Sequence, residues 1–388
     1  MTFDLAERPE DVGLDGARVA ALVERARREV DAGLLPSCQL AIAREGRIAA
    51  FETFGHPTGA PPRYVLFSAT KGVVAGAFTI LVGEGRVDPD QRVAEIVPEF
   101  ATNGKDAVTV EQVLLHTAGF PLAPLGPPEW DTREGRLAVF ERWRLNWEPG
   151  TAFEYHPLSA HWVLAEIIER LSGIDFRRFV HERVAAPLGM SGFRLGLPAD
   201  DQGDVAHLQI VGEAATPAEL EAALGVSEVP ATEITPQALL LLGTPEVLTV
   251  GLPGGGGVAT AADMAVYYQA LLHDTGGLWE PHALAELTGV VRNELPDPVF
   301  GIPAMRTRGL MTAGTDGLSH MRGFGRTVSP RAFGHDGAGG QIAWADPDTG
   351  ISFCYLTNGL DQNVVREARR TTALASLAGN CLAGVPTR

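Results

Sequence analysis

Lysine is almost absent from this sequence. The 388 residues include 31 lysines and arginines, and only Lys71 and Lys105 among them are lysines. Arginine keeps its charge in proteins, whereas a buried lysine can lose its proton. Lys71 follows Ser68 by three residues in an apolar run, so the two side chains share a helix face. We expect a removable proton beside a hydroxyl group here; the alternative is a core-helix lysine whose amine reaches solvent.

Cysteine and long apolar runs are also scarce. The three cysteines, Cys38, Cys354 and Cys381, are too few for a disulfide framework. No run reaches the roughly 18 apolar residues of a membrane span, and residues 1–13 lack the pattern of a signal peptide. A formal net charge of −17 disfavours nucleic acid and anionic membranes as partners. We therefore expect a cytoplasmic protein; the alternative, a signal peptide already removed, stays open.

Several functional fingerprints are missing as well. No serine lies in a complete Gly-x-Ser-x-Gly elbow, and the glycines at 254–257 lack the Gly-x-x-x-x-Gly-Lys pattern of a phosphate loop. His156 and His161 are five residues apart, so they share no helix face that would hold a metal. We expect neither a metal nor another cofactor.

The apolar patterns place strands near both ends of the chain and helices between them. Helical spacing covers residues 15–33, 65–82, 158–172, 261–272 and 364–377, and strand-like runs cover 38–43, 48–54, 340–345 and 351–356. The simplest arrangement is an α+β fold with one antiparallel sheet built from both termini and flanked by helices. We expect residues 1–88 and 290–388 to form this lobe, and 89–289 an inserted, mostly helical lobe with an irregular lid at 198–253.

Three short stretches carry the chemistry. They are Ser68-x-x-Lys71, Tyr155-His156-Pro157 and His335-Asp336-Gly337, in that order along the chain. With them the chain resembles the serine β-lactamase and penicillin-binding protein superfamily, most closely the carboxylesterases of class C β-lactamase fold (family VIII). The resemblance extends over about residues 12–380 and implies the superfamily's two-lobed fold and catalysis through an acyl-enzyme.

The resemblance implies a role for each matching residue. Ser68 would attack a carbonyl, Lys71 would take its proton, and Tyr155 would protonate the leaving group. A neighbouring charged lysine would hold Tyr155 as a phenolate or a relay, and the backbone N–H groups of Ser68 and Ala338 would bind the oxyanion. The residues expected to contact substrate are His335, Asp336, Gly337 and His156.

Two departures from the family pattern bear on the substrate. Pro157 stands where β-lactamases have asparagine, and His335 stands where they have a lysine that holds the lactam carboxylate. Both changes favour a small-molecule ester over an anionic lactam. We expect a serine carboxylesterase without a nucleic-acid or membrane partner. A β-lactamase, a D-amino-acid amidase or peptidase, an acyltransferase and a non-catalytic scaffold remain alternatives, and the oligomeric state is not readable.

Overall fold

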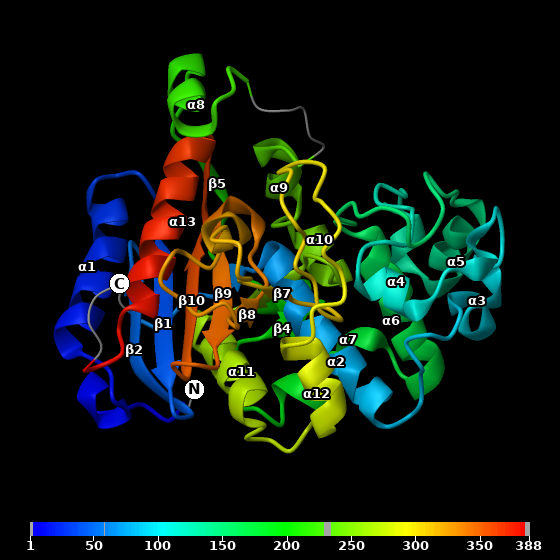
Figure 1. The fold of residues 1–388 in the computed structure, drawn as a ribbon, viewed down its shortest axis with the longest axis horizontal. Helices are drawn as coiled ribbons and strands as arrows, with labels where there is room; N and C mark the ends of the chain where they lie inside the picture. The colour runs from blue at the N-terminus through cyan, green and yellow to red at the C-terminus, as the bar shows by residue number, and fades with distance from the viewer. Residues whose placement is uncertain (1–2, 58, 229–233, 385–388) are drawn as a thin grey trace.

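A six-stranded antiparallel sheet forms the centre of one lobe (Figure 1). The computed structural model describes residues 3–57, 59–228 and 234–384, so Thr58 of the loop after the first hairpin and residues 229–233 of the expected lid lie outside it. In spatial order the strands are β2 (Arg47–Phe54), β1 (Cys38–Arg44), β10 (Ile351–Thr357), β9 (Ile342–Asp346), β8 (Phe333–Gly334) and β7 (Met311–Thr312). The sheet draws strands from both ends of the chain, which confirms the α+β expectation.

The hairpin that joins β1 to β2 is specified locally. Glu45 and Gly46 both have positive φ angles, 56° and 75°, which matches the twist of a two-residue hairpin turn. β1 also pairs with β10, with Leu40 opposite Tyr355. The N-terminal hairpin is thereby joined to the C-terminal strands.

Helices cover both faces of this sheet. α1 (Gly16–Asp31) and α13 (Val364–Gly379) lie on one face, and α11 (Ala261–His273) lies on the other (Figure 1). α11 begins at a capping box in which Thr260 and Asp263 exchange side-chain and backbone hydrogen bonds. α11 packs on β1, β9 and β10, although residues 261–273 fall within the range expected for the helical lobe. The division into 1–88 with 290–388 and 89–289 stays a prediction.

α2 (Thr70–Gly83) lies between the sheet-bearing lobe and the helical lobe (Figure 1). It is buried from Thr70 to Leu81, as its continuous apolar composition predicts. The helix begins later than expected, because Val65 belongs to the short strand β3 (Tyr64–Val65) and Phe67 has a φ of 47°. β3 pairs with β6 (Gly257–Ala259), which also pairs with β4 (Arg194–Leu195).

Further helices and strands lie in the helical lobe and in the expected lid. The helical lobe contains α3 (Val93–Ile96), α4 (Val110–Leu114), α5 (Arg133–Arg142), α6 (Ser159–Ser172) and α7 (Phe176–Val180). The expected lid contains β5 (Gln209–Val211), α8 (Pro217–Leu224), α9 (Pro236–Leu241) and α10 (Pro245–Val250), and α12 (Pro281–Thr288) packs on α2. None of the helices in the described part of the chain combines the length and apolarity of a membrane span.

Candidate active site

Ser68 lies in a tight turn, Phe67–Ala69, directly before α2. Leu66 N donates to Gly257 O and Gly257 N donates to Thr70 Oγ1, so β6 holds the turn from both sides. The φ of 47° at Phe67 is a conformation that a non-glycine residue adopts at a cost of about 1–3 kcal/mol. The strained turn leaves Ser68 partly exposed at the N-terminus of a helix whose dipole favours negative charge.

Lys71 is completely buried one helical turn from Ser68. Its Nζ donates to the carbonyl oxygens of Pro157, at 2.7 Å, and Gly254, at 2.5 Å, and lies 3.3 Å from Ser68 Oγ. Burial, aided by the charge of Arg306, lowers the pKa of Lys71 well below its usual 10.5. In its neutral form this amine would donate its two hydrogens to the two carbonyls and leave its lone pair for the Ser68 hydroxyl.

Tyr155 comes from the loop before α6, and its ring lies against Lys71. Lys71 Nζ is 4.9 Å from the ring centroid, and the buried Tyr155 Oη makes no hydrogen bond within the described residues. Burial raises the pKa of Tyr155, against smaller opposing effects of Arg306 and the Ser68 hydroxyl. The raised pKa keeps the phenol neutral, so of the two expected states of Tyr155 the relay fits this environment and the phenolate does not.

His335 follows β8 and is 2% exposed. Its Nε2 lies 3.1 Å from Arg306 Nη1, and its Nδ1 lies 2.8 Å from the backbone oxygen of Asp336. Since arginine can only donate, His335 accepts at Nε2 and carries its proton on Nδ1. Both ring nitrogens are thus engaged, and His335 holds Arg306 in place. The expected contact of His335 with substrate stays a prediction.

The chain after His335 runs beside the nucleophile. A Cβ atom on Gly337 would lie 2.3 Å from Leu66 O, so only glycine permits this approach to the Ser68 turn. Asp336, Gly337 and Ala338 are partly exposed. This placement is compatible with an oxyanion hole made by the N–H groups of Ser68 and Ala338.

His156 does not join this group as a substrate contact. It is fully buried; its Nε2 accepts from Phe120 N and its Nδ1 lies 2.6 Å from Glu154 O. Both ring nitrogens therefore hold backbone of the helical lobe. The burial of His156 and its two backbone partners do not support the expected contact with substrate, which stays a prediction.

Three participants were not expected from the sequence. The carbonyls of Pro157 and Gly254 hold Lys71. Every residue has a backbone carbonyl, so the sequence does not indicate which ones accept from a given side chain. Arg306 lies before β7, is 6% exposed, and places its Cζ 5.2 Å from the Tyr155 ring centroid. No motif surrounds this arginine, so only the fold reveals it.

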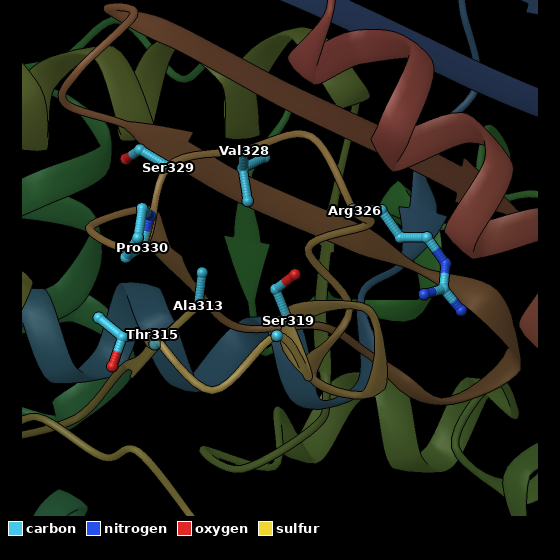
Figure 2. A pocket seen from close by; sticks show the side chains of 9 residues that line it. Ala313, Thr315, Ser319, Arg326, Val328, Ser329 and Pro330 are labelled. Atoms are coloured by element: carbon cyan, nitrogen blue, oxygen red, sulfur yellow. The ribbon is translucent and has the colours of Figure 1, made fainter. Parts of the chain in front are cut away.

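Two hollows lie outside the group around Ser68. One has a volume of about 290 Å³ and lies beside the segment between β7 and β8. Figure 2 shows its lining, with Val328 and Pro330 opposite Ala313 and Ser319. The other, about 580 Å³, is lined by residues from Glu111 to Thr117, Gly150 and Arg292 to Pro296. Within the described ranges, no group of three or more histidine, cysteine, aspartate or glutamate side chains is arranged to hold a metal.

Comparisons with known proteins identify the family of the chain. The family model described as Beta-lactamase matches residues 21–378. The chain is 31% identical over 322 residues to "Esterase/beta-lactamase LipL" of Mycobacterium tuberculosis, covering 78% of this chain and 71% of that protein.

Two solved structures are similar along almost their whole length. A penicillin-binding protein homologue from Caulobacter crescentus has a TM-score of 0.75 and 28% identity, covering 94% of this chain and 99% of that one. A family VIII carboxylesterase has a TM-score of 0.75 and 25% identity, with the same coverage. The chain, with its serine and lysine one turn apart at the junction of two lobes, belongs to the Beta-lactamase family of serine hydrolases.

Proposed function

We propose that this protein hydrolyses small carboxylic esters through a covalent acyl-enzyme on Ser68. The observation that carries the proposal is the environment of Lys71. Its Nζ donates to two carbonyl oxygens and lies 3.3 Å from Ser68 Oγ, and burial lowers its pKa well below 10.5. A lysine whose pKa is lowered in this way is a base for the serine hydroxyl.

Acylation follows from this arrangement. Ser68 Oγ attacks the ester carbonyl carbon while its proton passes to Lys71 Nζ. The backbone N–H groups of Ser68 and Ala338 stabilise the resulting oxyanion. When the tetrahedral intermediate collapses, the bond to the alcohol oxygen breaks and Tyr155 Oη gives that oxygen its proton. The proton on Lys71 then restores Tyr155.

Deacylation reverses these roles with water as the nucleophile. Water attacks the acyl carbon and gives up a proton to the lysine–tyrosine pair, and Ser68 Oγ leaves with a proton from the same pair. Tyr155 Oη, which has no hydrogen-bond partner among the described residues and lies on the ring beside Lys71, supports the use of this pair first as proton acceptor and then as proton donor.

The choice of an ester rests on the departures from the β-lactamase pattern. Pro157 contributes its backbone carbonyl to Lys71 and has no amide side chain for a lactam. His335 is buried, and burial lowers its pKa well below 6.5, so it supplies no charge in place of the lysine. Two relatives, one named an esterase/β-lactamase and one a family VIII carboxylesterase, support the same substrate class.

The first experiment compares wild type with Ser68→Ala on p-nitrophenyl butyrate. We expect kcat/KM to fall by at least about a thousandfold, because removal of the nucleophile leaves only binding and oxyanion contacts. A matched control is Ser319→Ala, whose hydroxyl donates to Gly325 O on the 313–330 segment. Undiminished hydrolysis by the Ser68 variant would refute the assignment.

A substrate panel separates the alternatives. A chromogenic cephalosporin, D-amino-acid amides and an alcohol acceptor test for β-lactamase, amidase and acyltransferase activity alongside the ester. We expect the ester to be turned over with the highest kcat/KM. Faster turnover of the cephalosporin or the amide would replace the proposal, and failure of a fluorophosphonate probe to label Ser68 would favour a scaffold without catalysis.

A further inference from the structure

His116 lies in the loop after α4 and has a left-handed backbone conformation. Its φ is 58°, although the residue is only 2% exposed. Phe67, which precedes Ser68, and Met305, which precedes Arg306, also have positive φ angles. Backbone strain of this kind gathers at functional sites, where surrounding contacts hold the residue in place. His116 therefore calls for a functional reason, as the turn at Ser68 does.

His116 binds the backbone on both sides of Tyr155. Its carbonyl oxygen accepts from Glu154 N at 3.3 Å, and its ring Nδ1 accepts from His156 N at 3.1 Å. Because a backbone N–H only donates, Nδ1 carries no proton, and the neutral ring has its hydrogen on Nε2. Burial lowers the pKa of His116 well below 6.5, which keeps Nδ1 available as an acceptor. One residue thus holds both the residue before Tyr155 and the residue after it.

The His116 ring also packs against the Tyr155 ring. The two centroids are 4.9 Å apart, closer than the 6.0 Å between the rings of Tyr155 and His335. The buried Oη of Tyr155 has no hydrogen-bond partner among the described residues. The position of this hydroxyl therefore depends on the backbone at residues 154–156 and on the groups packed against the ring. His116 supplies contacts of both kinds.

We propose that His116 is a positioning residue for Tyr155, which holds the phenol where it can protonate the leaving alcohol. The inference rests on the proposed function and adds a residue to its machinery. His116 itself exchanges no proton with the substrate, because its Nδ1 is engaged by His156 N. It acts through Tyr155, so its loss should matter most for esters whose alcohol leaves only with a proton.

The first test compares two butyryl esters that differ in this need. The ethoxide of ethyl butyrate is a poor leaving group that requires a proton, whereas p-nitrophenolate is stable and requires it little. His116→Phe keeps an aromatic ring without the Nδ1 acceptor. Its kcat/KM on ethyl butyrate should fall by about 10- to 100-fold, the range for a misplaced catalytic group, with a much smaller loss on p-nitrophenyl butyrate. Equal losses on the two esters would indicate general damage and overturn the inference.

The double variant His116→Phe with Tyr155→Phe tests whether His116 acts through the phenol. Once the hydroxyl is gone its position no longer matters, so His116→Phe should cost little more on ethyl butyrate in the Tyr155→Phe background. His116→Asn should restore most of the activity, because its amide oxygen can accept from His156 N and asparagine tolerates a positive φ. A loss of the same size with and without the Tyr155 hydroxyl would contradict the positioning role.

His161 supplies the matched control. It is also 2% exposed, its ring centroid lies 6.1 Å from that of His116, and neither of its ring nitrogens has a hydrogen-bond partner in the described chain. His161→Phe therefore removes a buried imidazole from the same cluster without releasing the backbone around Tyr155. It should leave the ratio of kcat/KM on the two esters unchanged. A ratio altered as much as in His116→Phe would remove the special role of His116.

Amide hydrogen exchange separates this inference from the proposed function, because it needs no substrate. Mass spectrometry follows peptides that span residues 154–156. Faster exchange there in His116→Phe, with wild-type exchange in His116→Asn and His161→Phe, supports the positioning role even if the protein hydrolyses no ester. Conversely, hydrolysis that depends on Ser68, with unchanged exchange and an unchanged ester ratio in His116→Phe, would reject the positioning role and keep the esterase.

Discussion

The protonation state of Lys71 is the residue-scale feature on which the chemistry depends. Burial and the Arg306 charge lower its pKa, and Asp336 acts in the opposite direction. A base must be neutral, so kcat/KM is expected to rise with pH through this lowered pKa and then level off.

The acid limb of the pH profile of kcat/KM should shift in opposite directions when the charge of Arg306 or the charge of Asp336 is removed. Arg306→Gln removes a positive charge, which raises the pKa of Lys71 and moves the limb to higher pH. Asp336→Asn removes a negative charge and moves it to lower pH. Profiles of kcat/KM on a neutral ester measure both shifts, and Arg308→Gln, which removes an arginine paired with Glu111, serves as the control. Shifts of the same sign in the two variants would contradict this account.

Tyr155 provides a second residue-scale prediction. Removing its hydroxyl in Tyr155→Phe takes away the proton donor while the ring stays against Lys71. We expect kcat/KM to fall by about 10²- to 10⁴-fold, the usual contribution of a positioned acid or base. Tyr64→Phe is the control for loss of a buried tyrosine hydroxyl, because Tyr64 Oη donates to Ser37 Oγ. Tyr155→Phe activity within about twofold of wild type would remove Tyr155 from the mechanism.

At the scale of elements, the packing of α2 against α11 positions the catalytic turn. Tyr267 Oη donates to Gly72 O at 2.6 Å, and a Cβ on Gly76 would lie 2.2 Å from that hydroxyl. Gly76 is therefore required by the close contact of two helices. This contact fixes the first turn of α2, which carries Lys71.

Gly76→Ala should lower the free energy of unfolding by about 1–3 kcal/mol, the usual cost of overpacking. Urea unfolding measures the change. Gly203→Ala, where a Cβ meets nothing within 4 Å, should change it by less than about 0.5 kcal/mol. Tyr267→Phe combined with Gly76→Ala should recover part of the loss. An unchanged free energy of unfolding in Gly76→Ala would mean that α2 and α11 are not held at this distance.

Elements with local signals were predictable from the sequence, and those set by distant contacts were not. The hairpin turn at Glu45 and the cap at Thr260 have short-range causes that are readable in the sequence, and the structure contains both. The start of α2 was misplaced because Val65 is as apolar as a helix residue, and only its pairing with Val258 makes it a strand. Arg306 was missed for the same reason, since its partner His335 is remote in sequence.

At the scale of the whole molecule, one apolar core joins the two lobes. It contains Ala41 of the sheet, Val73 of α2 and Trp162 of α6, while a second core lies between the sheet and α1 and α13. The active site therefore lies at the junction of two lobes that share packed side chains.

A shared core predicts cooperative unfolding. Urea transitions followed by far-UV circular dichroism and by tryptophan fluorescence should coincide, because α2 cannot leave one lobe without exposing the other. The Ser68→Ala protein, which keeps this core, should behave in the same way. Two separate transitions would show that the lobes unfold independently and that the junction is weaker than its packing indicates.

The most direct test of the central claim is the mass of the protein after a brief, acid-quenched exposure to p-nitrophenyl butyrate. The account predicts a gain of one butyryl group, located by peptide mapping on Ser68, slower to appear in Tyr155→Phe and absent in Ser68→Ala. An adduct on another residue, or the same adduct in Ser68→Ala, would contradict it.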